Sequence, residues 1–491
     1  MFVDIDPIVR KKIILIARIF LVVCAVVIVF ALLRYGHISI DTQSDDTVIT
    51  LRNTDGTLVD EKKRKLSRFN VVGEYVLSVS NKNGEISKNI SINPLLWITE
   101  KITPPAAPIA ATPVINRYVR DLNPYDANNL LFLDSQSRSI VSIDQQNSIT
   151  RFSPKDTINR VEWLSKSDAY VLVNNFYNPK LYRYSSGVFT EIALNIGNME
   201  NQKASIKLSQ KNVLYITIAG GLFRLNEKTN QLEKITTVPP QSEIGAVSDN
   251  KFVIIEPIDD KSNPFAMKYV SLDMSGKKLG EMNALSGEGN SGILRISWSP
   301  DETKVAISGA DGGIFDSQLK RVAGFPTKIS NLAVWAKDGS ILYTRENLIF
   351  KYDTKTNQSQ SIVAIPTYST VTELFVNQSV DINHEYLYFN ISYGKGITKL
   401  YRVKLGAEPI KNSILDVLNE SDMRTITSSC LVNYVYNSQL SLIVQYAQNG
   451  DSNNDAAARS ECARKVSDYL RDIGLDASKI DIKYYSGLNQ L

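Results

Sequence analysis

Hydrophobic positions along this chain follow three different patterns. Residues 13–33 are apolar apart from Arg18. From residue 36 to about residue 410, apolar and polar residues alternate in short runs, which is typical of strands that bury one face. Residues 430–491 combine a hairpin pattern with apolar positions at helical spacing from about Asp455 to Ile473. The pattern predicts a mainly β protein with an N-terminal transmembrane helix and a small α+β C-terminal domain.

Residues 13–34 are expected to form the transmembrane helix. The 21 residues from Ile13 to Leu33 would span about 31 Å, close to the thickness of a bilayer core. Arg10, Lys11 and Lys12 precede them, so the positive-inside rule keeps residues 1–12 in the cytoplasm and exports the remainder. The alternative is a cleaved signal peptide, but the apolar run is too long and no small-residue cleavage site follows it. We therefore expect a single-pass protein of the plasma (inner) membrane.

Residues 36–92 predict a small antiparallel β-sandwich beside the membrane. Runs of period two, such as Thr47–Leu51, are separated by Asn-Thr-Asp-Gly and Asn-Lys-Asn-Gly turns. The stretch Gly73–Val79, followed by a turn and Ile86–Ile92, resembles the second half of PEGA domains, although the motif that names the family is absent. PEGA domains occur outside membrane anchors in bacterial envelope proteins, so the resemblance implies the same place for this domain.

The densest charge run in the chain consists of Lys62, Lys63, Arg64 and Lys65. One interpretation is contact with anionic lipid headgroups or acidic wall polymer, where each basic residue is worth about 1 kcal/mol. The other is a solvated loop whose positive charge is partly offset by the neighbouring acidic pair at 60–61, and this interpretation is favoured.

The segment 93–113 carries five prolines and is expected to be an extended linker that cannot complete a sheet.

Internal repeats dominate residues 114–410. A strand of apolar, aromatic, basic and apolar residues recurs, and the turn residues after its seven copies lie 37 to 51 positions apart. The full copies are Leu181–Tyr184, Leu222–Leu225, Ile349–Tyr352 and Leu400–Val403, and the degenerate copies are Ile140–Ile143, Tyr269–Leu272 and Gly313–Phe315. The mean spacing of about 43 residues is that of a four-stranded propeller blade.

Polar turns precede the second strand of each repeat, most clearly Trp298-Ser299-Pro300-Asp301. These turns resemble the Trp-Ser-Pro-Asp-Gly turns of TolB-like and WD-repeat-like propellers, and the seven copies of the repeat predict a seven-bladed β-propeller over residues 114–410. Val114–Val119 is expected to supply the strand that closes the last blade. Within the repeated strand, the aromatic residue should pack between blades and the basic residue should face solvent; stacking on a glycan or nucleic acid is the less favoured alternative.

Residues 411–429 are polar and are expected to form a helix or a linker, and residues 430–491 predict a small α+β domain. Cys462 lies on the apolar stripe of its helix and Cys430 opens the adjacent hairpin. In an oxidising compartment the two are expected to form a disulfide worth roughly 3 kcal/mol, the alternative being two buried thiols. The run from Ala463 to Leu475 is similar to the helix-to-strand passage of OmpA-like peptidoglycan-binding domains. The family's ligand-holding aspartate and arginine would fall at Ala447 and Cys462, which cannot do that work.

The composition of the chain argues against several classes of function. The net formal charge is +4, and most of the excess lies in the first 35 residues, so no nucleic-acid surface is expected. Two histidines and three cysteines leave little material for histidine catalysis or Cys/His metal sites, and no Gly-x-Ser-x-Gly motif is present. We expect no enzyme activity, cofactor or metal, but an extracytoplasmic scaffold whose propeller binds an envelope protein. The alternative is a sensor or receptor for a small ligand or cell-wall glycan in the propeller channel.

Overall fold

The structure is a computed structural model in which the chain divides into two compact units. Unit 1 comprises Met1–Pro108, Gly324–Thr327 and Lys355–Ser361, and unit 2 comprises the remainder. The structure describes residues 17–27, 35–82, 84–93, 97–102, 111–126, 129–197, 202–258, 267–283, 296–307, 313–322, 333–336, 338–345, 348–365, 370–376, 386–392, 398–404, 414, 418, 425–427, 429–436, 439–447 and 452–486.

The N-terminal segment is described only in part. Residues 17–27 are helical, and the rest of the expected span 13–34 lies outside the described residues. Within the described part of the chain, no helix is both long enough and apolar enough to cross a membrane. The transmembrane helix therefore stays a prediction.

Unit 1 contains two sheets that enclose an apolar core. One has the order β4-β1-β7, and the other includes the order β6-β5-β2-β3. The strands are β1 (Tyr35–Asp41), β2 (Val48–Asn53), β3 (Leu58–Lys63), β4 (Lys65–Val71), β5 (Gly73–Asn81), β6 (Gly84–Ile92) and β7 (Trp97–Lys101). Because their residues alternate, each strand turns one side inward, as Ile38 and Ile40 of β1 and Leu77 and Val79 of β5 do.

Part of the expected linker at 93–113 is wrong, because two strands lie inside it. β7 pairs in parallel with β1, Trp97 lying opposite His37 and Lys101 opposite Asp41. The sandwich is therefore not purely antiparallel. The second strand, β8 (Thr112–Ile115), belongs to unit 2. No proline lies within 97–101, so the backbone N–H groups of this segment can donate hydrogen bonds to a neighbouring strand. Ile98 packs on the core.

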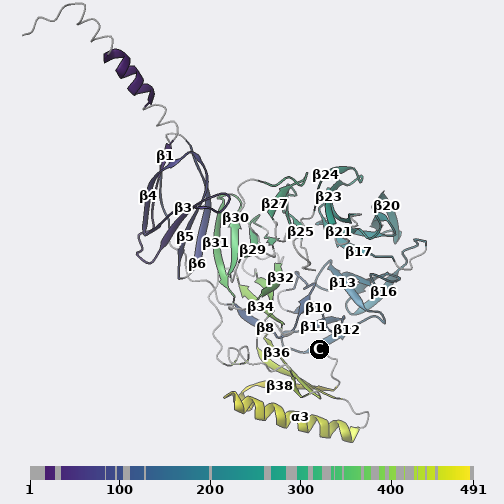
Figure 1. The fold of residues 1–491 in the computed structure, drawn as a ribbon. Helices are drawn as coiled ribbons and strands as arrows, with labels where there is room; N and C mark the ends of the chain where they lie inside the picture. The colour runs from purple at the N-terminus through teal and green to yellow at the C-terminus, as the bar shows by residue number, and fades with distance from the viewer. Residues whose placement is uncertain are drawn as a thin grey trace, which may run out of the picture. The chain divides into compact units, whose positions relative to one another are not determined.

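Unit 2 is built from successive antiparallel meanders, drawn in Figure 1 from blue through green. The first three are β9 (Val119–Arg120), β10 (Leu130–Asp134), β11 (Ile140–Ile143) and β12 (Ile149–Phe152); β13 (Ile158–Trp163), β14 (Asp168–Val173), β15 (Lys180–Ser185) and β16 (Val188–Ile192); β17 (Ser205–Leu208), β18 (Leu214–Ile218), β19 (Gly221–Asn226) and β20 (Gln231–Thr237). The next three are β21 (Glu243–Val247), β22 (Lys251–Pro257), β23 (Met267–Asp273) and β24 (Lys278–Asn283); β25 (Ile296–Trp298), β26 (Lys304–Ile307) and β27 (Gly313–Asp316); β28 (Ala333–Trp335), β29 (Ile341–Arg345), β30 (Leu348–Asp353) and β31 (Gln358–Ala364), of which residues 358–361 belong to unit 1. The last contains β32 (Thr370–Val376), β33 (Tyr386–Ser392) and β34 (Thr398–Lys404). The mainly β, propeller-like class of fold is confirmed, and the count of seven blades stays a prediction.

The repeated polar turn has a simple physical basis. A serine follows the first strand of four meanders, and its hydroxyl accepts the backbone N–H at or just before the start of the second strand. These bonds run to Ser165 from Asp168 (3.1 Å), to Ser209 from Val213 (3.3 Å), to Ser248 from Lys251 (2.9 Å) and to Ser299 from Lys304 (2.9 Å). A side-chain acceptor at this position satisfies a donor that the tight turn leaves unpaired, which explains why the pattern recurs.

The last meander receives its outer strand from the beginning of unit 2. Ile115 of β8 lies opposite Leu400 of β34, and Thr112 lies opposite Arg402. Asn390 of β33 links this meander to the first one, because its side chain donates to the carbonyl of Val119 at 2.6 Å and accepts from its N–H at 3.4 Å. The closing strand thus starts two residues before the expected segment 114–119.

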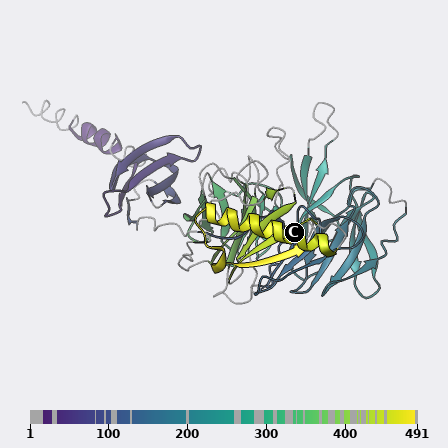
Figure 2. The same ribbon diagram turned by 90° about the horizontal axis from the view of Figure 1, so that it is seen from below.

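The C-terminal domain is a sheet covered on one face by a helix, as Figure 2 shows. The sheet contains β35 (Thr425–Thr427), β36 (Cys430–Tyr436), β37 (Leu440–Tyr446) and β38 (Asp481–Ser486), and the helix is α3 (Ser452–Asp472). The expected linker at 411–429 is wrong in part, since β35 pairs with β36 and Leu418 is buried in the core beneath α3. Apolar residues within a polar stretch gave too weak a periodic signal to identify this segment.

This domain is docked on the propeller by buried contacts. Val435 of β36 pairs with Ile115 of β8, and Val435 and Ile443 share a core with propeller residues such as Phe132. Two asparagines supply the polar contacts. Asn116 accepts the N–H of Tyr434 at 3.1 Å, and the Asn147 amide donates to the Gln439 carbonyl at 2.8 Å and to the Ser441 hydroxyl at 2.9 Å.

The docking also changes the surroundings of one repeated basic residue. Arg402 is buried, and its guanidinium lies 5.7 Å from the centroid of the Tyr436 ring. The expectation that the basic residue faces solvent is therefore wrong in this copy, because the C-terminal domain covers it. In the copy on β19, Arg224 is exposed as expected.

Replacing Asn147 with alanine should weaken this docking. Asn147 is buried in a turn with φ 57°, and Asn230 occupies an exposed turn with φ 54°. Both alanine variants incur backbone strain, but only N147A also removes hydrogen bonds to the C-terminal domain, so it should lose about 1 to 3 kcal/mol more than N230A. Urea unfolding measures the difference. Equal losses in the two variants would contradict the role given to the Asn147 side chain.

Candidate functional site

A cluster of charged side chains lies on the first strands of consecutive meanders. Asp121 directly follows β9, Arg160 and Glu162 lie on β13, and Lys207 lies on β17. Arg160 contacts Asp121 at 3.0 Å and Glu162 at 2.9 Å, while Lys207 contacts Glu162 at 3.2 Å. The second carboxylate oxygen of Asp121 accepts the N–H of Val161 at 2.9 Å. We call these four charged residues the inner-strand cluster.

The inner-strand cluster is electrically balanced, with two acids and two bases. Burial lowers the pKa of Lys207, with the nearby Arg160 acting in the same direction and Glu162 opposing it. Burial also raises the pKa of Tyr125, and the charge of Glu162 adds to that shift. Such a cluster can link neighbouring sheets through paired charges, and its desolvation cost is offset by hydrogen bonds that satisfy each group.

Sequence analysis missed this cluster, although the signal was present. The segment Arg160-Val161-Glu162-Trp163 alternates polar and apolar residues, with Val161 and Trp163 buried and the two charged side chains turned to the opposite face. Alternation showed which face each residue occupies, but pairing with Asp121 and Lys207 depends on how neighbouring sheets pack. In the part of the chain that the structure describes, no group of three or more His, Cys, Asp or Glu is placed to hold a metal ion.

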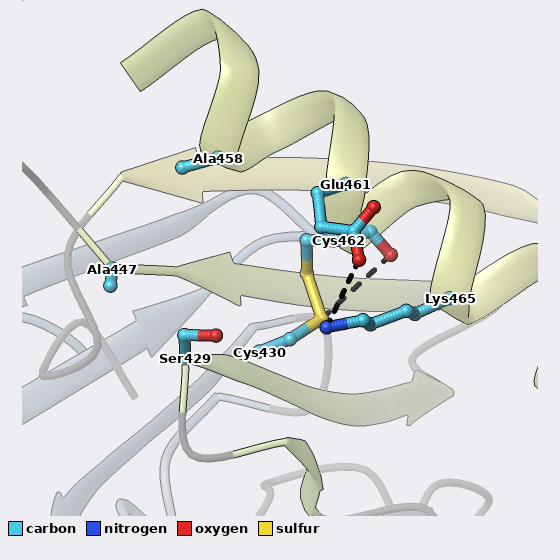
Figure 3. A pocket seen from close by; sticks show the side chains of 7 residues that line it. All are labelled: Ser429, Cys430, Ala447, Ala458, Glu461, Cys462 and Lys465. Atoms are coloured by element: carbon cyan, nitrogen blue, oxygen red, sulfur yellow. Dashed lines mark hydrogen bonds and ion pairs between the residues drawn. A yellow bond between two sulfur atoms is a disulfide. The ribbon is translucent and has the colours of Figure 1, made fainter. Parts of the chain in front are cut away.

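A second candidate is a small pocket in the C-terminal domain. Figure 3 shows this recess of about 250 Å³ between α3 and the strand ends. Its lining consists of Ser429, Cys430, Ala447, Ala458, Glu461, Cys462 and Lys465. Glu461 is held by Arg464 at 2.9 Å and by Lys465 at 3.1 Å. Glu461 and Lys465, two of the polar groups that line the pocket, are therefore engaged with each other.

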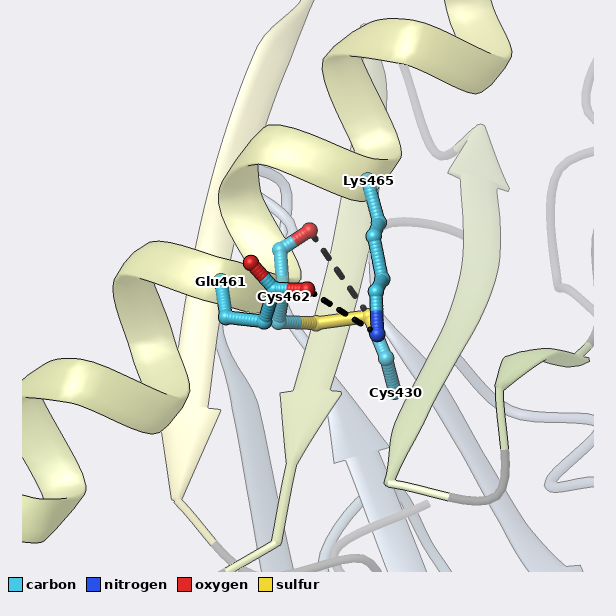
Figure 4. The surroundings of a disulfide bond; sticks show 4 residues. All are labelled: Cys430, Glu461, Cys462 and Lys465. Carbon is cyan, nitrogen blue, oxygen red and sulfur yellow. Dashed lines mark hydrogen bonds and ion pairs between the residues drawn. A yellow bond between two sulfur atoms is a disulfide. The ribbon is translucent and has the colours of Figure 1, made fainter.

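The two cysteines expected to pair lie side by side next to this pocket. Their Cα atoms are 5.6 Å apart and the sulfurs are joined as a disulfide, drawn in yellow in Figure 4. The bond connects the start of β36 to the middle of α3, with both residues buried. It would hold the helix against the sheet. Cys24, in the helical stretch 17–27, is a free cysteine.

The basic run spans the connection from β3 to β4, which belong to different sheets, with Arg64 between the two strands. Lys62, Lys63, Arg64 and Lys65 are all exposed. Arg64 has φ 61° and pairs with the exposed Asp45 at 2.9 Å. Lys65 lies opposite Asp41 at the end of β1, whereas the predicted membrane segment precedes the other end of that strand at Tyr35. Contact with an anionic surface stays a prediction.

Removing the disulfide should destabilise the C-terminal domain. The bond closes a separation of 32 residues, so the double variant C430S/C462S should lose about 3 to 4 kcal/mol of unfolding free energy relative to C24S. Urea unfolding of the full chain measures this, and non-reducing peptide mapping tests the bond itself. Free thiols at both positions in the protein isolated without reductant would contradict the pairing.

The pH dependence of stability should change when Glu461 is neutralised. Hydrogen bonds from Arg464 and then Lys465 lower the pKa of Glu461 from 4.5 to about 2. Its contribution is therefore present above pH 4.5 and is lost as pH falls towards 2. Wild type should exceed E461Q in stability at pH 7 and lose that advantage over this window, as measured by chemical unfolding. D472N is the control for the loss of one negative charge, since Asp472 is on the same helix and has no ion pair among the described residues. If E461Q and D472N show the same pH profile, the ion pairs of Glu461 do not cause the pH dependence.

Comparison with known proteins adds limited information. No family model matches this chain, and no curated protein matches it. Solved structures that are similar include "Structure of Dos1 propeller", at 12% identity and TM-score 0.42 over 78% of this chain and 97% of that one. "YCF48 bound to D1 peptide" has 11% identity and TM-score 0.42, covering 62% of this chain and 98% of that one. A virginiamycin B lyase from Staphylococcus aureus has 14% identity and TM-score 0.35, covering 60% and 94%. Scores this low carry no argument about activity, and the propeller-like fold class rests on the strand order described above.

Proposed function

We propose that this chain is a non-enzymatic scaffold, anchored by a single membrane span and binding a partner protein of the cell envelope through its propeller. In this proposal residues 13–34 cross the plasma (inner) membrane with the N-terminus in the cytoplasm. The PEGA-like sandwich then lies next to the membrane, and unit 2 lies outside the cytoplasm. The sequence supports the anchor through its apolar run and basic flank.

The observation that carries the proposal is the mutual pairing within the inner-strand cluster. A receptor site for a small polar ligand usually presents a few convergent polar groups within an apolar pocket. Here Arg160 contacts two carboxylates, and Glu162 contacts two cations. These groups join three neighbouring meanders rather than converge on a ligand. A rigid body of this kind is suited to present its outer loops to another protein.

One observation favours the alternative, a sensor or receptor for a small ligand or cell-wall glycan. The hydroxyl of Ser297, on the first strand of the fifth meander, is buried without a hydrogen-bond partner among the described residues. A ligand hydroxyl could pair with it. Wall binding through the OmpA-like helix is not part of either proposal, because Ala447 and Cys462 stand where that family holds its ligand.

The scaffold proposal predicts a stoichiometric protein partner that is independent of the inner-strand cluster. Tagged full-length protein is crosslinked in cells with a lysine-reactive reagent, and the captured proteins are quantified by mass spectrometry. The control carries residues 1–34 on an unrelated exported domain. A second sample carries the variant E162Q/K207M, which removes both members of one ion pair together and so avoids leaving a buried charge unpaired.

Two results would speak against the scaffold. If no protein is enriched over the control, its main prediction fails. If a partner is captured by wild type but lost with the folded E162Q/K207M variant, recognition depends on the inner-strand cluster, and the scaffold proposal as stated fails. Release of the full-length chain by alkaline carbonate extraction of membranes would overturn the anchor specifically.

A further inference from the structure

Two adjacent aromatic side chains are exposed on one loop of unit 2. Phe176 and Tyr177 lie between β14 and β15, with 54% and 72% of their surface exposed. Among the described residues of this unit, the other large apolar side chain with comparable exposure is Val188, at 64%. Two neighbouring exposed aromatics have a high solvation cost and are typical of contact surfaces rather than of a free protein surface.

The backbone beneath these aromatics is held in place from both sides. Asn174 and Asn178 both adopt φ 52°, a left-handed conformation that asparagine tolerates well. Four hydrogen bonds fix the loop: Tyr177 N–H to Asn174 O (3.0 Å), Asn174 N–H to Thr157 O (3.2 Å), Asn175 N–H to Asn159 Oδ1 (3.0 Å) and Ala204 N–H to Asn175 O (2.9 Å). The loop is therefore preorganised, which reduces the entropy lost when it binds.

Charged residues around the loop are paired and balanced. Lys203 forms an ion pair with Glu243, and its ammonium lies 5.6 Å from the centroid of the Phe176 ring. Lys180, three residues after Tyr177, pairs with Asp156 at 2.8 Å. Among the described residues, these two ion pairs contribute no net charge. A polyanion such as a nucleic acid gains no attraction here, whereas an apolar surface of neutral charge fits.

We propose that Phe176 and Tyr177 form the anchor through which the propeller docks on its partner, a protein that presents an apolar pocket with a hydrogen-bond acceptor for the tyrosine hydroxyl. This inference rests on the proposed scaffold function and assigns it a surface. Tyrosine and phenylalanine are enriched at the buried centres of protein interfaces, where a surrounding polar rim excludes water. The paired ions Lys203–Glu243 and Lys180–Asp156 would form that rim.

The test places a photoreactive residue at the loop itself. Benzoylphenylalanine replaces Tyr177 in the full-length tagged chain, cells are irradiated, and adducts are identified by mass spectrometry. The matched control carries the same residue at Val188. Val188 lies opposite Ser185, which lies opposite Asp168 at the start of β14, so it marks the end of this sheet away from the loop. One discrete protein adduct is expected from position 177 and none from position 188.

A second variant separates recognition from mere proximity. F176S, combined with benzoylphenylalanine at 177, removes the neighbouring ring while leaving the loop hydrogen bonds in place. If both aromatics are hot-spot residues, the adduct yield should fall by about 30-fold or more. V188S is the control for loss of an exposed apolar side chain, and its melting temperature and that of F176S should match wild type. An undiminished adduct in F176S would overturn the anchor role.

The outcomes also distinguish this inference from the scaffold proposal. A partner captured by the lysine-reactive reagent but not from position 177 would sink the anchor and leave the scaffold standing. No capture by either route would overturn both. Adducts at 177 to glycan, to lipid or to a second copy of this chain would overturn the inference by naming a different occupant.

Discussion

The strand Thr112–Ile115 (β8) is hydrogen-bonded on both edges, and the architecture of unit 2 depends on this arrangement. On one edge it completes the last meander against β34, and on the other Ile115 meets Val435 of β36. β8 and β34 are far apart in the sequence, and their pairing removes an exposed sheet edge that would otherwise pair with other molecules. Loop-closure entropy rises only slowly with chain length, so joining such distant segments costs little more than joining near ones.

The closing strand is also the site where the C-terminal domain attaches. Asn116 and Asn147 bond to backbone atoms of that domain that lie 318 and 292 residues later in the chain. The disulfide in turn ties α3 to β36, so the helix, the sheet and the propeller edge form one connected body. The inner-strand cluster also links neighbouring meanders, because its ion pairs join residues from different sheets. The charges of this cluster pair with one another, and the exposed aromatic residues Phe176 and Tyr177 are the proposed place for recognition.

Much of this fold could be predicted from local chemistry. The serine turns are predictable because a hydroxyl acceptor after a strand satisfies a nearby backbone donor, and the alternating strands follow from one buried face. The strand at 97–101 was missed because its proline-rich surroundings resemble a linker, and Leu418 was missed because a single buried residue has no period. Arg402 was expected in solvent, since nothing near it in sequence shows that Tyr436 covers its guanidinium.

The sequence by itself determined the strands, their turns, the repeat spacing and the position of the two cysteines, because each depends on residues within a few positions of one another. Only the tertiary structure decided which distant residues meet. The pairing of β8 with β36, the contact of Lys207 with Glu162 and the hydrogen bond from Ala204 to the Phe176–Tyr177 loop all join segments from different meanders or domains. Local periodicity shows which face of a strand is buried. It does not show which neighbour covers that face, since this depends on how whole sheets pack.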